Sequence, residues 1–283
     1  MLVNAKQILE EAKRLSYAVP QFNINNLEWT RYILEESQSL KSPVILGVSE
    51  GAAKYFGGFR TVYNVVSSLI DDLNITIPVV LHLDHGSSVE FCQKAIEEGF
   101  TSVMIDASQY DIDKNILITN QVIEYAKSKN VSVEAEVGHI GGTEDNVKGN
   151  VLHATVEDCE KIVEETNLDF LAPALGSVHG LYKGKPNLNF SRMLEIKEKT
   201  KVPLVLHGGT GIDDKNIIQA IKHGICKINI NTDLQIEWSK KVRKFLIKNK
   251  KIYDPRKIIS SGEEAIKNKV REKIILFGSV NKI

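Results

Sequence analysis

Short apolar runs rich in valine and isoleucine alternate along the chain with longer segments whose apolar residues recur at helical spacing. This alternation is typical of β-α-β units and of a parallel sheet. The runs predict eight strands, at residues 17–23, 43–49, 78–84, 102–107, 131–137, 169–175, 202–207 and 226–231. The segments that follow them predict eight helices, at 26–41, 59–73, 88–98, 113–129, 155–166, 190–200, 213–223 and 232–249.

Two further helical regions flank this pattern, a short helix at 4–14 and a C-terminal helical extension at 254–283. Eight strand-helix units match a closed (β/α)8 TIM barrel better than an open doubly wound sheet. Because no Pro/Gly/Ser-rich linker interrupts the chain, residues 1–283 are predicted to form a single domain. The connections 138–154 and 176–189 are longer than usual, and we expect them to be functional loops.

Polar side chains gather at the carboxyl ends of the predicted strands, which form the active face of such a barrel. They are Asn23, Ser49, Glu50, Asp84, His85, Asp106, Glu134, Glu136, His179, His207, Asn229, Asn231 and Thr232. The amino ends of the strands carry mostly proline, valine and serine. The asymmetry predicts a functional site at the carboxyl face.

Three of the seven histidines close predicted strands 3, 6 and 7, and each is followed by glycine: His85, His179 and His207. Three converging imidazoles leave a tetrahedral cation with one open position, which is the arrangement of catalytic zinc. One such histidine alone would more often be a core residue, so the prediction depends on the coincidence of three. The other histidines are expected to pack, cap or be solvated: His82, His139, His153 and His223.

Asp84 and His85 are adjacent, and a regular strand would turn them to opposite faces. We therefore expect the chain to leave the ladder at Gly86, so that both side chains reach one site. Farther on, segments 206–212 and 229–233 combine a glycine-rich turn with a helix start. Backbone N–H groups in such places bind phosphate, and late strands of a barrel are where phosphate sites recur.

Composition excludes several classes of function. The 36 basic and 36 acidic residues cancel, and no basic face with interleaved aromatics is visible, so nucleic-acid binding is not expected. No apolar run reaches the about 18 residues of a membrane span, and the charged N-terminus is not a signal peptide. Cys92, Cys159 and Cys226 are too far apart for a C-x-x-C pair, which favours buried thiols in a reducing cytoplasm.

Long stretches of the sequence resemble one known family. They include YAVPQFNINNLE (17–28), HLDHGSS (82–88), SVEAEVGHIGGTEDNV (132–147), LAPALGSVHGLYKGKPNL (171–188), LVLHGGTGI (204–212) and ICKININTD (225–233). The chain is similar in these motifs to class II fructose-1,6-bisphosphate aldolases and to the related tagatose-bisphosphate aldolases. The match runs nearly end to end, so it is highly specific.

The resemblance implies zinc-dependent aldol cleavage of fructose 1,6-bisphosphate to dihydroxyacetone phosphate and glyceraldehyde 3-phosphate, in glycolysis and gluconeogenesis. It implies that His85, His179 and His207 hold Zn²⁺, that Asp84 is the general acid/base, and that Glu144 transfers a proton at the ketone half. Further implied features are a second divalent metal at Asp106 and Glu136, a monovalent cation (Na⁺ or K⁺), and a cytoplasmic homodimer or homotetramer. Substrate and phosphate contacts are expected from Asn23, Ser49, Gly180, Lys183, Gly208, Gly209, Thr210, Asn229, Ile230, Asn231, Thr232 and Arg256, the last from a neighbouring subunit.

Three alternatives stay open at this point. Tagatose 1,6-bisphosphate is the first, because the two sugars differ only in stereochemistry at C4. The second is a lysine-dependent aldolase with Lys227 as nucleophile, although no activating group is evident beside it. The third is a zinc-binding barrel without activity, which the presence of both Asp84 and Glu144 opposes.

Overall fold

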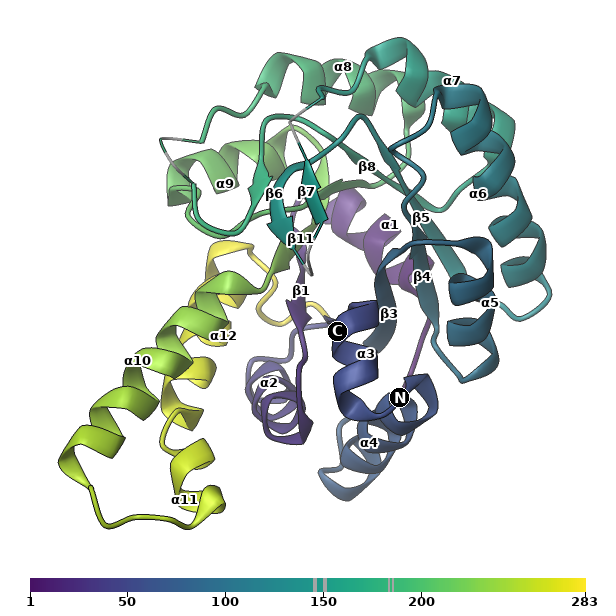
Figure 1. Cartoon of the computed structure of the whole chain (residues 1–283). Coiled ribbons are helices and arrows are strands. Elements are labelled where there is room, and N and C mark those ends of the chain that lie inside the picture. Colours follow the sequence, from purple (N-terminus) through teal and green to yellow (C-terminus); the bar gives the residue numbers. More distant parts are fainter. Residues whose placement is uncertain (145–146, 150–151, 183, 185) are drawn as a thin grey trace.

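The computed structural model describes residues 1–144, 147–149, 152–182, 184 and 186–283, and it shows a closed barrel of parallel strands (Figure 1). The strands are β1 (Val19–Asn23), β2 (Val44–Val48), β3 (Val79–Gly86), β4 (Ser102–Ile105), β5 (Ser132–Val137), β8 (Phe170–Pro173), β10 (Leu204–Leu206) and β11 (Ile225–Ile230). Each pairs with the next in this order, and β11 pairs with β1 to close the ring. The TIM barrel predicted from the sequence is confirmed.

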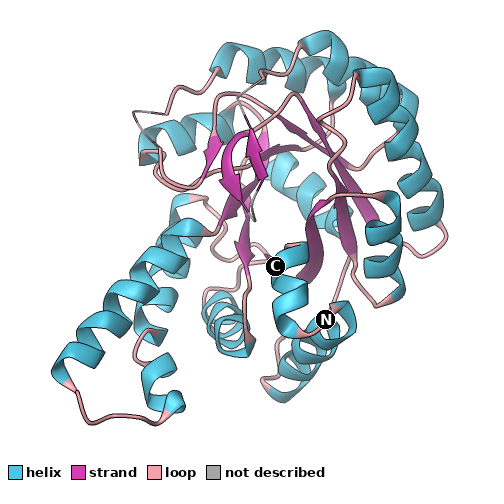
Figure 2. Cartoon of the chain, viewed as in Figure 1, coloured by secondary structure: helices cyan, strands magenta, loops and turns pink. Residues whose placement is uncertain are grey.

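A helix follows each barrel strand along the chain, and most of these helices surround the barrel (Figure 2). They are α2 (Leu27–Ser39), α4 (Phe59–Asp72), α5 (Val89–Glu97), α6 (Ile112–Lys127), α7 (Val156–Thr166), α8 (Phe190–Thr200), α9 (Asp214–Lys222) and α10 (Thr232–Lys248). Side chains immediately before several of them accept hydrogen bonds from first-turn amides, as Ser88, Asp111 and Asp213 do for α5, α6 and α9. These caps explain why the predicted helix starts agree closely with the observed ones.

The C-terminal part departs from a simple repeat of strand and helix. Helix α10 runs away from the barrel and buries only Leu234 and Val242, whereas α12 (Glu263–Leu276) returns to pack against α2 and α10 (Figure 1). Between them lies the short α11 (Pro255–Ser260), at the end of α10 that is distant from the barrel. The predicted C-terminal extension therefore supplies the helix that covers β1.

Two regions predicted as irregular contain regular structure. The connection after β2 includes α3 (Glu50–Phe56), which the sequence pattern did not predict. The long connections 138–154 and 176–189 contribute β6 (Gly141–Glu144), β7 (Val147–Gly149) and β9 (Val178–His179) to a separate small sheet. In it β6 pairs antiparallel with β7 and parallel with β9, so the two long loops are joined to each other.

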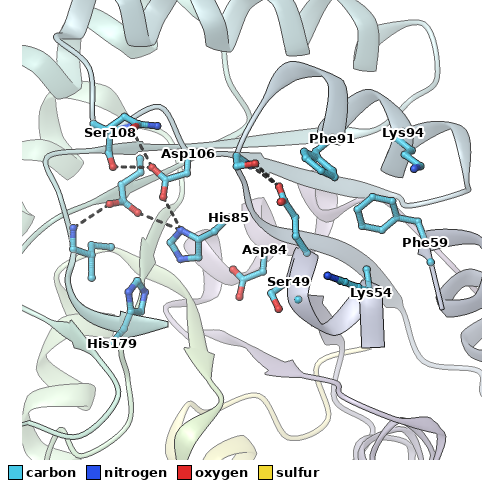
Figure 3. A pocket seen from close by; sticks show the side chains of 18 of the residues that line it. Ser49, Lys54, Phe59, Asp84, His85, Phe91, Lys94, Asp106, Ser108 and His179 are labelled. Atoms are coloured by element: carbon cyan, nitrogen blue, oxygen red, sulfur yellow. Dashed lines mark hydrogen bonds and ion pairs between the residues drawn. The ribbon is translucent and has the colours of Figure 1, made fainter. Parts of the chain in front are cut away.

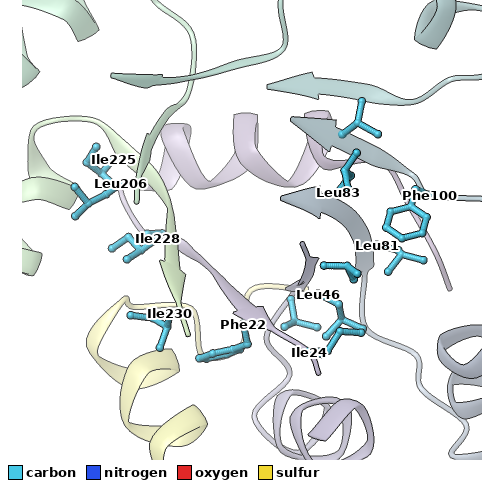
Figure 4. Close-up of a cluster of buried hydrophobic side chains, with 14 of the residues drawn as sticks. Phe22, Ile24, Leu46, Leu81, Leu83, Phe100, Leu206, Ile225, Ile228 and Ile230 are labelled. Carbon is cyan, nitrogen blue, oxygen red and sulfur yellow. The ribbon is translucent and has the colours of Figure 1, made fainter. Parts of the chain in front are cut away.

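The main hydrophobic core lies between the barrel and its helices. Outward-facing residues such as Phe22, Leu46, Leu81 and Ile228 are fully buried there (Figure 4). A second apolar cluster closes the amino end of the barrel, where α1 (Ala5–Leu15) inserts Leu9 among inward-facing strand residues.

The barrel interior changes character along its axis. Apolar side chains fill its amino end, beside α1. Towards the carboxyl ends the buried interior residues are polar or charged: Gln21, Asn23, His82, Asp84, Glu134, Glu136, His207, Lys227 and Asn229. Because unpaired buried charges are costly, these side chains must compensate one another or hold a ligand.

Candidate active site

The carboxyl end of β3 departs from regular strand geometry. Its pairing with β4 shifts between Leu83 and Gly86, and His85 adopts a positive φ of 52°. Such a bulge re-aims side chains, and a non-glycine residue in this region of backbone space is strained. Asp84 and His85 consequently both line the same cavity. The prediction that the chain leaves the ladder at Gly86 is wrong, since Gly86 still pairs with Ile105 and the bulge reorients the side chains.

Three histidines from separate parts of the chain meet at the mouth of the barrel. His85, His179 and His207 each offer a ring nitrogen, and these atoms lie within 4.8 Å of one another. His85 Nε2 and His207 Nδ1 are 2.9 Å apart. The structure therefore brings together the three imidazoles that the sequence singled out.

This donor set fits a tetrahedral divalent cation. Zinc-nitrogen bonds of about 2.0–2.1 Å place two ligand nitrogens roughly 3.3 Å apart in a tetrahedron. The 2.9 Å between His85 Nε2 and His207 Nδ1 is close to that value, so a small movement would accommodate the ion. Three neutral imidazoles are ligands that zinc favours, and they leave a fourth position for substrate.

Two carboxylates lie on the other side of the His85 ring. Asp106 Oδ2 is 2.9 Å from His85 Nδ1, and Glu136 Oε2 is 3.9 Å from the same nitrogen (Figure 3). Asp106 also accepts hydrogen bonds from the amide and hydroxyl of Ser108, whose hydroxyl contacts His139 Nδ1. His139 is thus part of the site wall and not the solvated loop residue that was expected.

Glu136 combines burial with incomplete pairing. Its Oε1 accepts the amide of Ile140 at 3.0 Å, and its buried Oε2 accepts no hydrogen bond within the described part of the chain. Burial and the neighbouring Asp106 carboxylate raise the pKa of Glu136 well above its ordinary value. His85, Asp106 and Glu136 also place one ligand atom each within 4.8 Å of the others, which makes them a second group with metal-binding geometry.

Asp84 is held by two side-chain amides, from strands β1 and β11. Asn23 Nδ2 on β1 donates to one carboxylate oxygen at 2.9 Å, and Asn229 Nδ2 on β11 donates to the other at 3.3 Å. Burial would raise the pKa of Asp84, but the imidazoles of His85 and His207 outweigh it and the pKa lies well below its ordinary value. The carboxylate is therefore ionised and fixed in orientation.

His207 is supported by charged groups inside the barrel. Its Nε2 lies 2.8 Å from Glu134 Oε1, and Glu134 Oε2 lies 2.6 Å from Lys227 Nζ. Burial opposes ionisation of Glu134, yet the Lys227 ammonium and the bond to His207 lower its pKa to about 2. Because Lys227 is buried and paired with a carboxylate, it is unsuited to act as the amine nucleophile of a lysine-dependent aldolase.

The small sheet carries His179 to the site. Gly142 on β6 pairs with His179 on β9 and has a φ of +108°. A Cβ at residue 142 would collide with the carbonyl oxygen of His179, and one at Gly208 would collide with that of Val178. Glycine is required at both positions because the backbone of β9 passes directly against them.

A narrow pocket lies on one side of the histidines. It is lined by Asn23, His179, Gly180, Gly208, Thr210, Asn229, Asn231 and Thr232. Its floor includes the start of α10, where Thr210 Oγ1 accepts the amide of Asp233. Gly209 and Ile230 do not line it, so the structure does not place their predicted contacts in this pocket. The Gly209 amide is bonded to Asn229 O, and the Ile230 side chain is buried in the main core.

A larger cavity of about 940 Å³ opens on the other side of the histidines. Its outer wall comes from α3, α4 and α5, and it includes Lys54, Phe59, Phe91 and Lys94 (Figure 3). Ser49 lies at its inner part, where its hydroxyl accepts the Ala52 amide and caps α3. The sequence assigned Ser49 to the site but missed the helix that Ser49 begins.

Three further predicted site residues are not placed in the site by the structure. Lys183 lies outside the described residues, and of Glu144 only the backbone, at the end of β6, is described. Arg256 is exposed on α11, where it pairs with Asp254 at 3.0 Å, and α11 is distant from the barrel of its own chain (Figure 1).

Glu134 and Lys227 were not predicted as supports of the site. The signal was present in SVEAEV (132–137), where two glutamates alternate with apolar residues in a buried strand. Residues two apart on a strand face the same side, so both carboxylates point into the barrel. The partners of Glu134, however, are His207, directly after β10, and Lys227 on β11, and no local pattern identifies them.

The chain is similar to known proteins over nearly its whole length. A family model described as fructose-bisphosphate aldolase class-II matches residues 3–282. A fructose-bisphosphate aldolase of Geobacillus stearothermophilus is 57% identical over 282 residues, covering 99% of this chain and 98% of its own length. One from Staphylococcus epidermidis is 55% identical, with 99% of both chains covered.

Solved structures agree with these relatives. The YdjI aldolase from Escherichia coli K12 has a TM-score of 0.85 at 32% identity, over 99% of this chain and 98% of that one. Fructose-bisphosphate aldolase from Campylobacter jejuni has a TM-score of 0.87 at 25% identity, over 100% and 97% of the two chains. Both similarities extend over the barrel and the helices after it.

Proposed function

The chain belongs to the class-II fructose-bisphosphate aldolase family, and we propose that it cleaves fructose 1,6-bisphosphate with Zn²⁺ held by His85, His179 and His207. The family acts on a sugar bisphosphate and uses a divalent metal. One observation supports this proposal: the Asp84 carboxylate is held in place by two amides, directly beside three converging imidazoles.

Asp84 is the general acid/base of the proposed reaction. In cleavage it accepts the proton of the C4 hydroxyl, the C3–C4 bond breaks with its electron pair left on the ketone half, and C4 becomes the aldehyde carbon. In condensation Asp84 returns the proton. When bound, the divalent ion supplies a Lewis acid for the oxygens of the ketone half, on which negative charge grows.

Glu144 is proposed to handle the proton at C3 of the ketone half. Its place in β6 supports this role, because β6 pairs with the strand that carries His179. The longer connection that contains β6 and β7 would then bring an acid/base group to the face of the site opposite Asp84.

The two phosphates are assigned to the two cavities. The narrow pocket is proposed to hold the ketone-side phosphate, because it joins backbone around Gly180 and Gly208 to the N-terminal end of α10, which favours anions. The larger cavity then receives the aldehyde half, with Ser49 at its inner wall and Lys54 as a nearby cation. Arg256 of a neighbouring subunit remains a predicted contact to the second phosphate.

Asp106 has a role whether or not a second metal binds. Its 2.9 Å contact to His85 Nδ1 orients that ring so that Nε2 faces His207. A second divalent ion at Asp106 and Glu136, and a monovalent cation, remain predictions. The arrangement of His85, Asp106 and Glu136 supports the divalent one.

The proposal extends to the pathway, the cellular compartment and the oligomeric state of the protein. We propose a glycolytic and gluconeogenic enzyme of the cytoplasm, acting as a homodimer or homotetramer. The three unpaired buried cysteines support a reducing compartment. Within the described residues, no helix has both the length and the apolar character to cross a membrane.

One experiment tests the reaction, the metal and the sugar together. Cleavage of fructose and tagatose 1,6-bisphosphate is measured before EDTA treatment, after it, and after addition of Zn²⁺. The proposal expects fructose bisphosphate to be preferred, activity to vanish with the metal and Zn²⁺ to restore it. Activity that survives complete metal removal would overturn the mechanism, and a preference for tagatose bisphosphate would overturn the substrate.

A further inference from the structure

Behind the histidines lies a buried ionic group that the proposed mechanism does not use. Glu134 on β5 and Lys227 on β11 are both fully buried in the barrel interior, and so is His82 on β3. Glu134 and Lys227 form a 2.6 Å ion pair, and His82 Nε2 lies 3.5 Å from the same carboxylate oxygen. Strands β5 and β11 are separated in the sheet by β8 and β10, so the pair spans the barrel.

Glu134 uses its two oxygens in different directions. Oε2 faces the Lys227 ammonium, whereas Oε1 lies 2.8 Å from Nε2 of His207. An ionised carboxylate can only accept hydrogen bonds, so His207 carries its proton on Nε2 at this contact. The Nδ1 atom of His207 is then left with its lone pair, and it faces His85 Nε2 at 2.9 Å.

We propose that Lys227 and Glu134 are positioning residues that hold His207 in the tautomer and orientation in which Nδ1 binds the metal. This inference rests on the proposed metal site. The ion pair with Lys227 fixes one oxygen of Glu134, and the other oxygen accepts the hydrogen bond from His207 Nε2. Neither side chain touches the substrate, so their effect appears as metal affinity.

The decisive test compares two double variants from which the buried charge pair has been removed. In Glu134→Gln/Lys227→Met the amide carbonyl still accepts the His207 Nε2 proton, whereas in Glu134→Leu/Lys227→Met it has no acceptor. Both replace two buried charges by uncharged side chains of similar length, so both are expected to fold. Zn²⁺ affinity is measured by competition with a chromophoric chelator, and folding by circular dichroism.

The expected result is about 10–100-fold weaker Zn²⁺ binding for the leucine variant than for the glutamine variant. The single variant Lys227→Met should also bind Zn²⁺ more weakly than the wild type. Lys273→Met is the matched control, because Lys273 is a buried lysine that pairs with Asp233 at 3.0 Å outside the barrel interior. Its Zn²⁺ affinity should equal that of the wild type.

Equal Zn²⁺ affinity of the two double variants would overturn the inference. NMR of the His207 ring nitrogens gives an independent reading, since the Nε2-protonated tautomer should persist in the glutamine variant and be lost in the leucine variant. These readouts do not use aldol cleavage. A protein that binds Zn²⁺ as expected but cleaves no sugar bisphosphate would therefore contradict the proposed function and leave the positioning role standing.

Discussion

Asp84 and His85 are neighbours in sequence with separate surroundings. Amides of Asn23 and Asn229 hold the Asp84 carboxylate, while Asp106 orients the His85 ring. The bulge in β3 permits this division, at the cost of a left-handed backbone conformation at His85. One short segment thereby supplies both the proposed proton carrier and a proposed metal ligand.

Replacing Asp84 by asparagine should separate these two roles. Asp84→Asn removes the proton acceptor but keeps the size of the side chain, so kcat for cleavage should fall by about 10²–10⁴-fold. Zn²⁺ content, measured by atomic absorption on the purified protein, should stay at the wild-type level. A variant that has lost its Zn²⁺ would show that Asp84 helps to hold the metal.

Replacing His207 should remove the metal as well as the activity. His207→Ala removes one of the three imidazoles and leaves Glu134 without its second partner, so both Zn²⁺ content and cleavage should be lost. The same metal analysis and cleavage assay apply. If His207→Ala retained a full equivalent of Zn²⁺, the three-histidine site would be incorrect.

The elements around the barrel differ in what they contribute. The small sheet formed by β6, β7 and β9 lies outside the barrel and positions His179 through close backbone pairing. Helix α1 instead seals the amino end of the barrel with an apolar face, and its Ala5 amide also donates to Ser132 Oγ at 3.0 Å. Substitutions in these two elements should therefore affect different properties.

Gly142→Ala should damage the site without unfolding the barrel. The added methyl group would meet the His179 carbonyl oxygen at a backbone conformation that alanine rarely adopts, so β6 must move away from β9. Zn²⁺ affinity and cleavage should fall, while thermal unfolding changes little. Gly184→Ala is the control, because a Cβ there meets nothing within 4 Å and should leave all three properties unchanged.

Leu9→Ala should lower the stability of the protein and leave the metal site intact. Leu9 is fully buried in the cluster between α1 and the barrel strands, and its truncation leaves a cavity. The free energy of unfolding should drop by about 2–5 kcal/mol in a denaturant titration. Zn²⁺ affinity of the folded variant should be unchanged, since a change there would mean that α1 is coupled to the mouth of the barrel.

The sequence predicted elements well where the signal was local. Ser88, Asp111 and Asp213 mark helix starts, and eight apolar runs mark the barrel strands. The sequence did not predict strands that are very short or that pair with a distant part of the chain. Strands β6, β7 and β9 have two to four residues each, and they exist because the two long connections pair with each other.

At the scale of the whole molecule, the barrel and the metal site are separable. The main core lies between the strands and the helices, and it contains no proposed metal ligand. Removal of the metal should therefore leave the circular dichroism spectrum unchanged while cleavage is lost. Added Zn²⁺ should raise the melting temperature, because free ligand at 100 times Kd stabilises the folded state by about 2.7 kcal/mol. Collapse of the spectrum on metal removal would contradict this separation.

The C-terminal helices show how distant parts of the chain complete the molecule. Helix α12 reaches back to α2, where Arg271 binds Glu36 at 2.7 Å, and to α10, where Lys273 binds Asp233. Asp233 in turn donates its amide to Thr210 beside the narrow pocket. The last helix thus supports both the barrel wall and the start of α10 near the proposed phosphate site.

The sequence by itself determined the barrel, its active face and the three histidines, because apolar periodicity and strand-end position are local properties of the chain. Only the tertiary structure decided which atoms meet. In it Glu134 and Lys227 lie behind His207, and two side-chain amides donate to Asp84. Gly209 and Ile230 lie outside the lining of the narrow pocket. Such contacts depend on barrel closure, which joins strands remote in sequence, and on the bulge in β3, whose position no periodicity marks.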